Sequence, residues 1–150
     1  MTSGVDTTFL VELEIQEAEG HQRARDYLSR TVLDSGDSLA LAPQVLAEFV
    51  HVVTDKRRFQ HPLETEAALA RADFWWRAEE VRQVYPDAAA VTLFLHWMHR
   101  YELGRKRILD TLLAATYVAA GVRRIITTDA RDYGIYGELE VVRPGTGGQR

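Results

Sequence analysis

Short apolar runs alternate with longer amphipathic segments along almost the whole chain. The apolar runs are bounded by turn-forming residues, a pattern typical of buried strands. They predict one strand that ends at Val5 and four more over residues 39–42, 81–85, 123–128 and 139–142. Apolar residues at helical spacing predict helices over residues 7–19, 21–34, 43–56, 62 to at least 76, 88–103 and 108–120.

Proline, aspartate and glycine mark several of the predicted helix ends. Pro43 and Pro62 stand where the first helical residue is expected, a position that suits the fixed φ of proline. Asp87 is placed to cap the helix that follows it. Three glycines stand where helices are expected to end: Gly20, Gly104 and Gly121.

Strands that alternate with helices imply βαβ units and therefore a parallel sheet. The sequence has no internal repeat and no stretch typical of a linker between domains. Its 150 residues are enough to bury the core of one domain. We therefore predict a single α/β domain over residues 1–143, followed by a flexible tail over residues 144–150.

Composition excludes several classes of protein. The absence of cysteine excludes a disulfide framework, a thiolate zinc site and a cysteine nucleophile. No segment approaches the ~20 apolar residues of a membrane helix, and the start lacks the regions of a signal peptide. We therefore expect a cytoplasmic protein that does not bind membranes. The net charge of −4 disfavours a protein that coats nucleic acid, although it allows an enzyme with a local basic rim.

Aspartates directly follow two of the predicted strands, Asp6 after the first and Asp129 after residues 123–128. The carboxyl ends of parallel strands meet at one edge of a sheet, where ligands bind in open α/β folds. Taken alone, Asp129 is equally explained as a cap of the following turn. A functional role depends on whether other carboxylates converge on it.

Two further carboxylates are predicted near the same edge. Glu48 lies at the border of the apolar face of its helix, whereas a solvated glutamate usually lies on the far side. Asp110 lies in the first turn of the helix that starts at residue 108. Converging carboxylates repel one another unless a hard divalent cation neutralises them. Mg²⁺ and Mn²⁺ prefer oxygen ligands and support phosphoryl chemistry, so the pattern predicts a site for one of these ions.

With these residues the chain resembles the PIN-domain ribonucleases, and most closely the VapC-type toxins of VapBC toxin–antitoxin systems. The resemblance extends from residue 5 to about residue 143. It is carried by four segments in the same order: Asp6-Thr-Thr-Phe-Leu10, Pro43-Gln-Val-Leu-Ala-Glu-Phe49, Asp110-Thr-Leu-Leu-Ala-Ala115 and Ile126-Thr-Thr-Asp-Ala-Arg-Asp-Tyr133. The chain departs from the family at Thr8, where the family often has Asn or Ser, and in its short polar first strand.

The resemblance implies a three-layer α/β/α domain with a central, mostly parallel sheet of about five strands. It also implies an Mg²⁺- or Mn²⁺-dependent endoribonuclease that leaves the phosphate on the 5′ side. Carried over by motif, the catalytic residues are Asp6, Glu48, Asp110 and Asp129. The implied metal ligands are Asp6, Asp110 and Asp129.

Supporting residues are also implied by the resemblance. Thr7 and Thr127 match hydroxyl positions that support the first and last aspartates, and Asp132 matches a commonly acidic position beside the metal ligands. The implied partners are an RNA substrate, a cognate antitoxin protein and a second copy of the chain.

Basic residues near the predicted site are candidates for RNA contact. We favour Arg105, Lys106 and Arg107, because they precede Asp110 directly. The pairs Arg57-Arg58 and Arg123-Arg124 are equally explained as solvated charges at the ends of elements. His96 and His99 have the spacing of metal ligands, but no third ligand lies near them in the sequence, so two ordinary helical histidines are expected.

Three other functions are compatible with parts of this pattern. A housekeeping PIN nuclease in RNA processing or decay shares every motif, and only the small size of the chain favours the toxin. A non-catalytic acidic-pocket module, such as a response-regulator-like switch, requires an acidic neighbour for Asp6 and a lysine after the last strand, where this chain has Arg143. A haloacid-dehalogenase-type phosphatase requires an aspartate at the position of Thr8.

Overall fold

The computed structural model describes residues 1–145 of the chain. Its strands are β1 (Thr2–Val5), β2 (Ser38–Leu41), β3 (Val81–Gln83), β4 (Arg124–Ile126) and β5 (Glu140–Val142). Its α-helices are α1 (Thr7–Glu14), α2 (His21–Tyr27), α3 (Pro43–Val53), α4 (Thr65–Arg77), α5 (Ala88–Arg100) and α6 (Ile108–Ala119). Three short helical segments complete it: η1 (Leu28–Leu33), η2 (Arg105–Arg107) and η3 (Ala130–Asp132).

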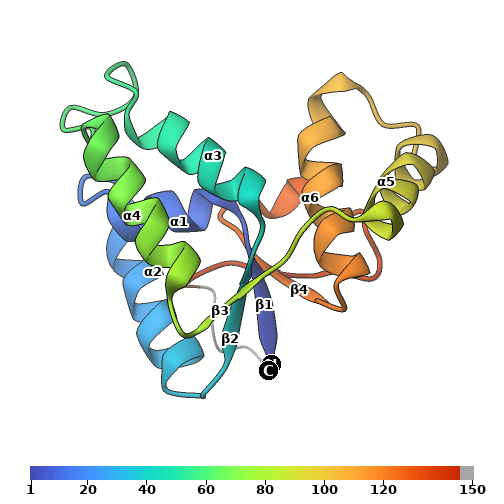
Figure 1. The fold of residues 1–150 in the computed structure, drawn as a ribbon, viewed down its shortest axis with the longest axis horizontal. Coiled ribbons are helices and arrows are strands. Elements are labelled where there is room, and N and C mark those ends of the chain that lie inside the picture. The colour runs from blue at the N-terminus through green and yellow to red at the C-terminus, as the bar shows by residue number, and fades with distance from the viewer. Residues whose placement is uncertain (146–150) are drawn as a thin grey trace.

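The five strands form one sheet in the order β3-β2-β1-β4-β5, and every neighbouring pair is parallel. Helices α1 to α4 lie on one side of this sheet, and α5 and α6 lie on the other (Figure 1). The predicted three-layer α/β/α fold with a central parallel sheet is therefore confirmed.

Strand β1 lies at the centre of the sheet, although its sequence is short and polar. It pairs with β2 over Thr2–Gly4 and with β4 over Gly4–Val5. The absence of a side chain at Gly4 has a steric cause, because an added Cβ would lie only 2.6 Å from the ring of Tyr117 in α6. The Tyr117 hydroxyl then donates a hydrogen bond to the Val5 carbonyl at 2.5 Å. Only a residue without a side chain allows α6 to pack this closely on the strand that leads to Asp6.

Replacing Gly4 with alanine is expected to destabilise the protein by about 1–3 kcal/mol, because the new methyl group overpacks against Tyr117. Urea unfolding of the variant and of wild type measures this difference. Gly137→Ala is the matched control, since an added Cβ there meets no atom within 4 Å. Equal stability of the two variants would contradict this account of β1.

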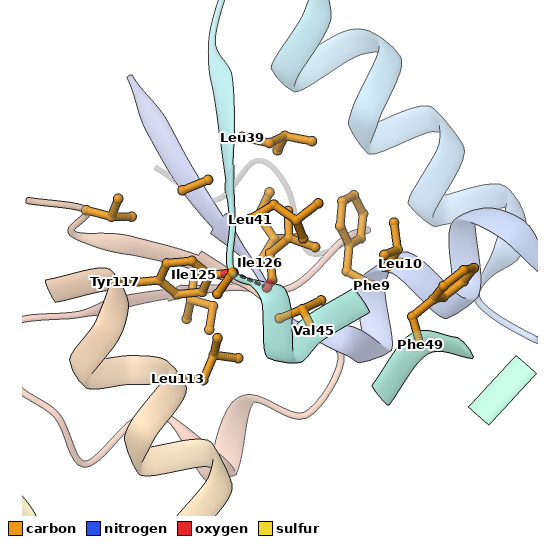
Figure 2. Packing of buried hydrophobic residues seen from close by; sticks show 14 of the residues in the cluster. Phe9, Leu10, Leu39, Leu41, Val45, Phe49, Leu113, Tyr117, Ile125 and Ile126 are labelled. Atoms are coloured by element: carbon orange, nitrogen blue, oxygen red, sulfur yellow. Dashed lines mark hydrogen bonds between the residues drawn. The ribbon is translucent and has the colours of Figure 1, made fainter. Parts of the chain in front are cut away.

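Buried apolar side chains fill the space on both sides of the strands. Figure 2 shows Leu113 and Tyr117 of α6 on one side and Phe9, Leu10 and Phe49 on the other. None of the helices within residues 1–145 is long and apolar enough to cross a membrane. The tail predicted over residues 144–150 lies outside the described residues, except for Pro144 and Gly145.

The first predicted helix is shorter than expected. It was predicted to reach residue 19, but α1 ends at Glu14 because Ile15 adopts extended backbone (φ −101°, ψ 110°) and is buried. The carboxylate of Glu17 then accepts hydrogen bonds from the backbone N–H groups of Gln60 and His61, at 3.0 and 2.7 Å. These bonds tie the turn after α1 to the loop between α3 and α4.

Two other helix ends also differ from prediction. Pro62 does not begin α4, because the N–H of the next residue, Leu63, donates to the carbonyl of Val53 and the helix starts only at Thr65. Gly104 does not end α5, since the helix stops at Arg100 and Glu102 takes the left-handed backbone conformation instead (φ 49°). The roles predicted for Asp87 and Gly121 agree with the structure: Asp87 accepts from the Ala90 N–H at 2.9 Å and Gly121 has φ 83°.

Candidate active site

The carboxyl ends of β1 and β4 deliver their aspartates to the same edge of the sheet. Asp6 follows β1 directly, and its N–H donates to the carbonyl of Ile126, the last residue of β4, at 3.0 Å. Asp129 follows β4 after two threonines. The parallel sheet therefore brings both aspartates to the same edge, where both line one cavity, as predicted for carboxylates at the ends of neighbouring strands.

Helix capping does not explain these aspartates. Asp6 and Asp129 stand at the positions before α1 and η3, but neither side chain makes a capping hydrogen bond. Asp87 stands at the equivalent position before α5 and does cap it. The carboxylates of Asp6 and Asp129 thus do not serve to start a helix.

The carboxylate of Asp6 is buried and held by three hydroxyl groups. Its Oδ2 atom accepts from Thr127 at 2.7 Å and from Thr8 at 3.0 Å. Its Oδ1 atom accepts from the hydroxyl of Tyr133 at 2.9 Å. A carboxylate oxygen offers about two acceptor positions, so Oδ2 is filled and Oδ1 keeps one position for a further ligand.

Tyr133 joins Asp6 to Asp110. Its hydroxyl oxygen lies 3.3 Å from Oδ1 of Asp110, which is in the first turn of α6. Asp6, Asp110 and Tyr133 come from three distant parts of the chain, and the tyrosine is almost fully buried. No role was predicted for Tyr133 from the sequence, because its partner Asp6 is far away in the chain.

Negative charge accumulates at this edge. Burial, together with the charges of Asp132 and Asp6, raises the pKa of Asp110 to about 6. Burial and a hydrogen bond shared with Asp129 also raise the pKa of Asp132. Arg107 offsets part of this charge, because its guanidinium lies 3.6 Å from the Asp132 carboxylate and donates to the Asp132 carbonyl.

Glu48 reaches the site from α3. The hydroxyl of Thr7 donates to its Oε2 atom at 3.0 Å. Thr7 was expected to support Asp6, but that support comes from Thr8 and Thr127. Thr127 was expected to support Asp129; its hydroxyl accepts from the Asp129 backbone N–H at 3.0 Å and also donates to Asp6.

A cavity of about 560 Å³ opens at this edge of the sheet, and all four predicted catalytic carboxylates line it together with Asp132. Its size lies within the range of small-molecule and cofactor sites. Arg105 and Lys106 are exposed on η2 and are not among the residues that line the cavity, whereas Arg58 is. His96 and His99 are both exposed on α5, away from this cavity.

A model of the PIN domain family matches residues 5–137. The chain belongs to the PIN domain family. No curated protein sequence matches it significantly. Its structural neighbours are VapC-type toxins of VapBC toxin–antitoxin systems.

Three solved structures illustrate this likeness. The sarcin–ricin loop-cleaving toxin VapC20 of Mycobacterium tuberculosis is 22% identical, with 96% of this chain and 100% of that chain covered and a TM-score of 0.72. VapBC-1 of nontypeable Haemophilus influenzae is 16% identical, with 95% of this chain and 98% of that chain covered and a TM-score of 0.65. VapBC2 of Rickettsia felis, bound to a promoter DNA fragment, is 14% identical, with 95% of this chain and 98% of that chain covered and a TM-score of 0.62. At these identities the likeness shows the PIN fold, and function has to be argued from the site.

PIN nucleases typically use a divalent metal ion. Within residues 1–145, no three His, Cys, Asp or Glu side chains are gathered so that they could hold an ion together. Mg²⁺ does not need such a cage, because it is typically held by one or two carboxylates and keeps several waters. The pair formed by Asp6 and Asp110, in a cavity lined by carboxylates and hydroxyls, fits a hard cation in its donor chemistry.

The raised pKa of Asp110 predicts a pH-dependent cost to stability in metal-free protein. Its ordinary pKa of 3.8 becomes about 6 on folding, so the folded state holds the proton more tightly than the unfolded state. The free energy of unfolding should therefore fall as pH rises from about 4 to 6, and the cost is fully present above pH 6.

Asp110→Asn removes this cost. At pH 7 in EDTA the variant is expected to be more stable than wild type by about 1–2 kcal/mol. This is less than the whole pKa shift of Asp110 would give as free energy of unfolding, because solvent screens a half-buried group. The two proteins should be equally stable near pH 4. Urea unfolding from pH 4 to 8 measures the difference, and a difference independent of pH would contradict the assignment.

Proposed function

We propose that this PIN domain is an Mg²⁺-dependent endoribonuclease, with Mn²⁺ able to substitute, that hydrolyses phosphodiester bonds in RNA. The observation that carries the proposal is the hydroxyl of Tyr133 shared between Asp6 and Asp110 in a cavity that Glu48 and Asp129 also line. A cavity lined by many carboxylates and few basic side chains suits a site that binds a metal ion and a phosphate.

The proposed roles follow from position. Asp6, Asp110 and Asp129 hold the cation, directly or through water. When bound, the cation supplies positive charge that polarises the scissile phosphate and lowers the pKa of water. Glu48, with one oxygen fixed by Thr7, orients the attacking water or accepts its proton.

Asp132 and Arg107 are proposed to tune the charge around these ligands. Asp132 shares a hydrogen bond with Asp129, and the nearby guanidinium of Arg107 offsets part of the resulting rise in the pKa of Asp132. We therefore assign Arg107 to the support of Asp132 rather than to RNA. Arg105 and Lys106 remain proposed as weak RNA contacts on the exposed surface beside Asp110.

Cleavage of labelled single-stranded RNA tests the proposed activity. Protein stripped of metal with EDTA should be inactive, and added Mg²⁺ or Mn²⁺ should restore cleavage with 5′-phosphate ends. Cleavage that persists in EDTA and leaves 2′,3′-cyclic phosphates would indicate a contaminating nuclease. Absence of cleavage with either metal on a varied pool of structured RNAs would contradict the proposal.

We also propose that the chain is the toxin of a type II toxin–antitoxin pair and that it forms a homodimer. Support for the toxin role comes from the full-length structural likeness to toxins crystallised with their antitoxins, as in complexes from Klebsiella pneumoniae and Rickettsia felis. The homodimer is proposed from membership of the PIN family alone. A housekeeping role in RNA processing or decay is the alternative. Growth arrest on induced expression, relieved by a neighbouring gene product that binds the chain, separates the two roles.

A further inference from the structure

The acidic cavity is not lined by carboxylates alone. Besides Asp6, Asp110 and their neighbours, its lining includes apolar side chains from α1, the turn after it, the end of α3 and the loop that follows: Val11, Ala18, Val52 and Phe59. We call these four residues the apolar wall. A nucleotide also has two chemically different ends, a charged phosphate and a flat, largely apolar base.

Arg58 stands out against the charge of this cavity. Among the described residues that line it, seven are acidic and Arg58 is the one basic residue. Within residues 1–145, Arg58 is exposed and no carboxylate lies within 4 Å of its guanidinium, whereas its neighbour Arg57 lies 3.6 Å from the carboxylate of Asp55. The charge of Arg58 acts on Asp55 only from a greater distance. An exposed arginine that no carboxylate approaches closely, beside an acidic site, is suited to hold a phosphate of the substrate.

The segment that carries Arg58 and Phe59 is held in place before any substrate arrives. The carbonyl of Asp55 accepts from the N–H groups of Arg58 and Phe59 at 3.1 and 3.2 Å. On the other side, Glu17 accepts from the N–H groups of Gln60 and His61. Phe59 also packs against the hydrophobic core. The rim is therefore preorganised, which reduces the entropy lost on binding.

Glu12 and Glu19 line the cavity as well. Their charges disfavour a phosphate close to them but not an uncharged base, so the two ends of a nucleotide are expected to bind in one orientation. The cavity volume of about 560 Å³ lies in the range of pockets that hold small ligands.

We propose that this wall is a nucleotide subsite, in which Arg58 binds a phosphate next to the scissile one and an unstacked base lies against Phe59 and Val52. The subsite rests on the proposed RNA cleavage and assigns the residues that position the nucleotide next to the scissile phosphate. A base can reach the wall only when it leaves a stack, so this subsite is expected to bind an unpaired segment of RNA more tightly than a duplex.

Binding of labelled single-stranded RNA in Mg²⁺ tests the subsite without cleavage, in a protein that carries Asp110→Asn throughout. Arg58→Ala is expected to raise the Kd about five- to tenfold, whereas Arg57→Ala should leave it nearly unchanged. Loss of one phosphate contact should also make the plot of the logarithm of the association constant against the logarithm of the salt concentration less steep. The magnitude of its slope should fall by about 0.7, in the Arg58 variant only. A purely structural role for Arg58 would not change this slope.

Phe59→Leu tests the base-binding part of the wall, because it keeps apolar bulk for the core but removes the ring. It is expected to raise the Kd about fivefold or more, by loss of stacking. Phe94→Leu is the matched control, since Phe94 is a partly buried ring on α5 outside the cavity. The melting temperature of each variant verifies that it is folded.

Equal Kd values and equal salt slopes for Arg58→Ala and Arg57→Ala would overturn the subsite. Tighter binding of duplex than of single-stranded RNA would overturn it too. Neither result bears on whether the wild-type protein cleaves RNA with metal, so failure of the subsite and failure of the proposed activity are distinguishable.

Discussion

Replacing Asp110 with asparagine is expected to lower the rate of RNA cleavage by more than about 100-fold. Loss of a residue that only supports a metal ligand typically costs about 10–100-fold, and Asp110 is proposed to hold the cation itself. Asparagine has the same shape and keeps an oxygen that can accept from Tyr133, so the fold should persist. Single-turnover cleavage of a defined RNA at saturating Mg²⁺ measures the effect.

Asp73→Asn is the matched control for this substitution. Asp73 pairs with Arg77 at 2.7 Å on α4 and does not line the cavity. The control should cleave at the wild-type rate. Cleavage at that rate by Asp110→Asn as well would remove Asp110 from the proposed site.

Tyr133→Phe is expected to raise the Mg²⁺ concentration needed for half-maximal cleavage by about tenfold or more. The substitution keeps the buried ring but deletes the hydroxyl that lies 2.9 Å from Asp6 and 3.3 Å from Asp110. The two carboxylates then lose the group that holds their Oδ1 atoms together, and partners of this kind typically contribute 10–100-fold to metal affinity. Tyr133 is thus a positioning residue and is not proposed to react.

The control for Tyr133→Phe is Tyr136→Phe. Tyr136 is equally buried and its hydroxyl bonds to Thr111 at 2.5 Å, but it contacts none of the four carboxylates. The melting temperature in EDTA and its rise on adding Mg²⁺ provide a readout independent of activity. A Tyr133→Phe protein with the metal requirement and Mg²⁺-induced stabilisation of wild type would show that the shared hydroxyl has no role at the site.

The fold could be predicted because the signals for it are local. Apolar runs such as residues 123–128, alternating with amphipathic helices, determine a parallel sheet, and the parallel sheet places Asp6 and Asp129 at one edge. The errors occurred where a distant partner overrides a local signal. Pro62 looks like a helix start, yet the hydrogen bond from Leu63 to Val53 keeps that segment extended.

The supporting residues of the site were harder to predict than the carboxylates. Thr7 and Thr8 are adjacent, and successive helical residues point about 100° apart. Which of the two reaches Asp6 therefore depends on the exact start of α1, and Thr8 does. Tyr133 could not be found at all, because its hydrogen bonds to Asp6 and Asp110 exist only after the chain folds.

Proximity in sequence was also a poor guide to the basic residues. Arg105 and Lys106 lie close to Asp110 in the sequence but do not line the cavity. Arg58 lies far from every catalytic candidate except Glu48, yet the loop tied down by Glu17 brings it to the rim.

The most direct test of this account is a calorimetric titration of Mn²⁺ into metal-free protein. Wild type and the Asp73→Asn control should bind the ion with the same affinity, and Asp110→Asn should bind it at least about tenfold more weakly. Equal binding by all three proteins, or no binding by wild type, would show that the carboxylates at the ends of β1 and β4 do not form a cation site.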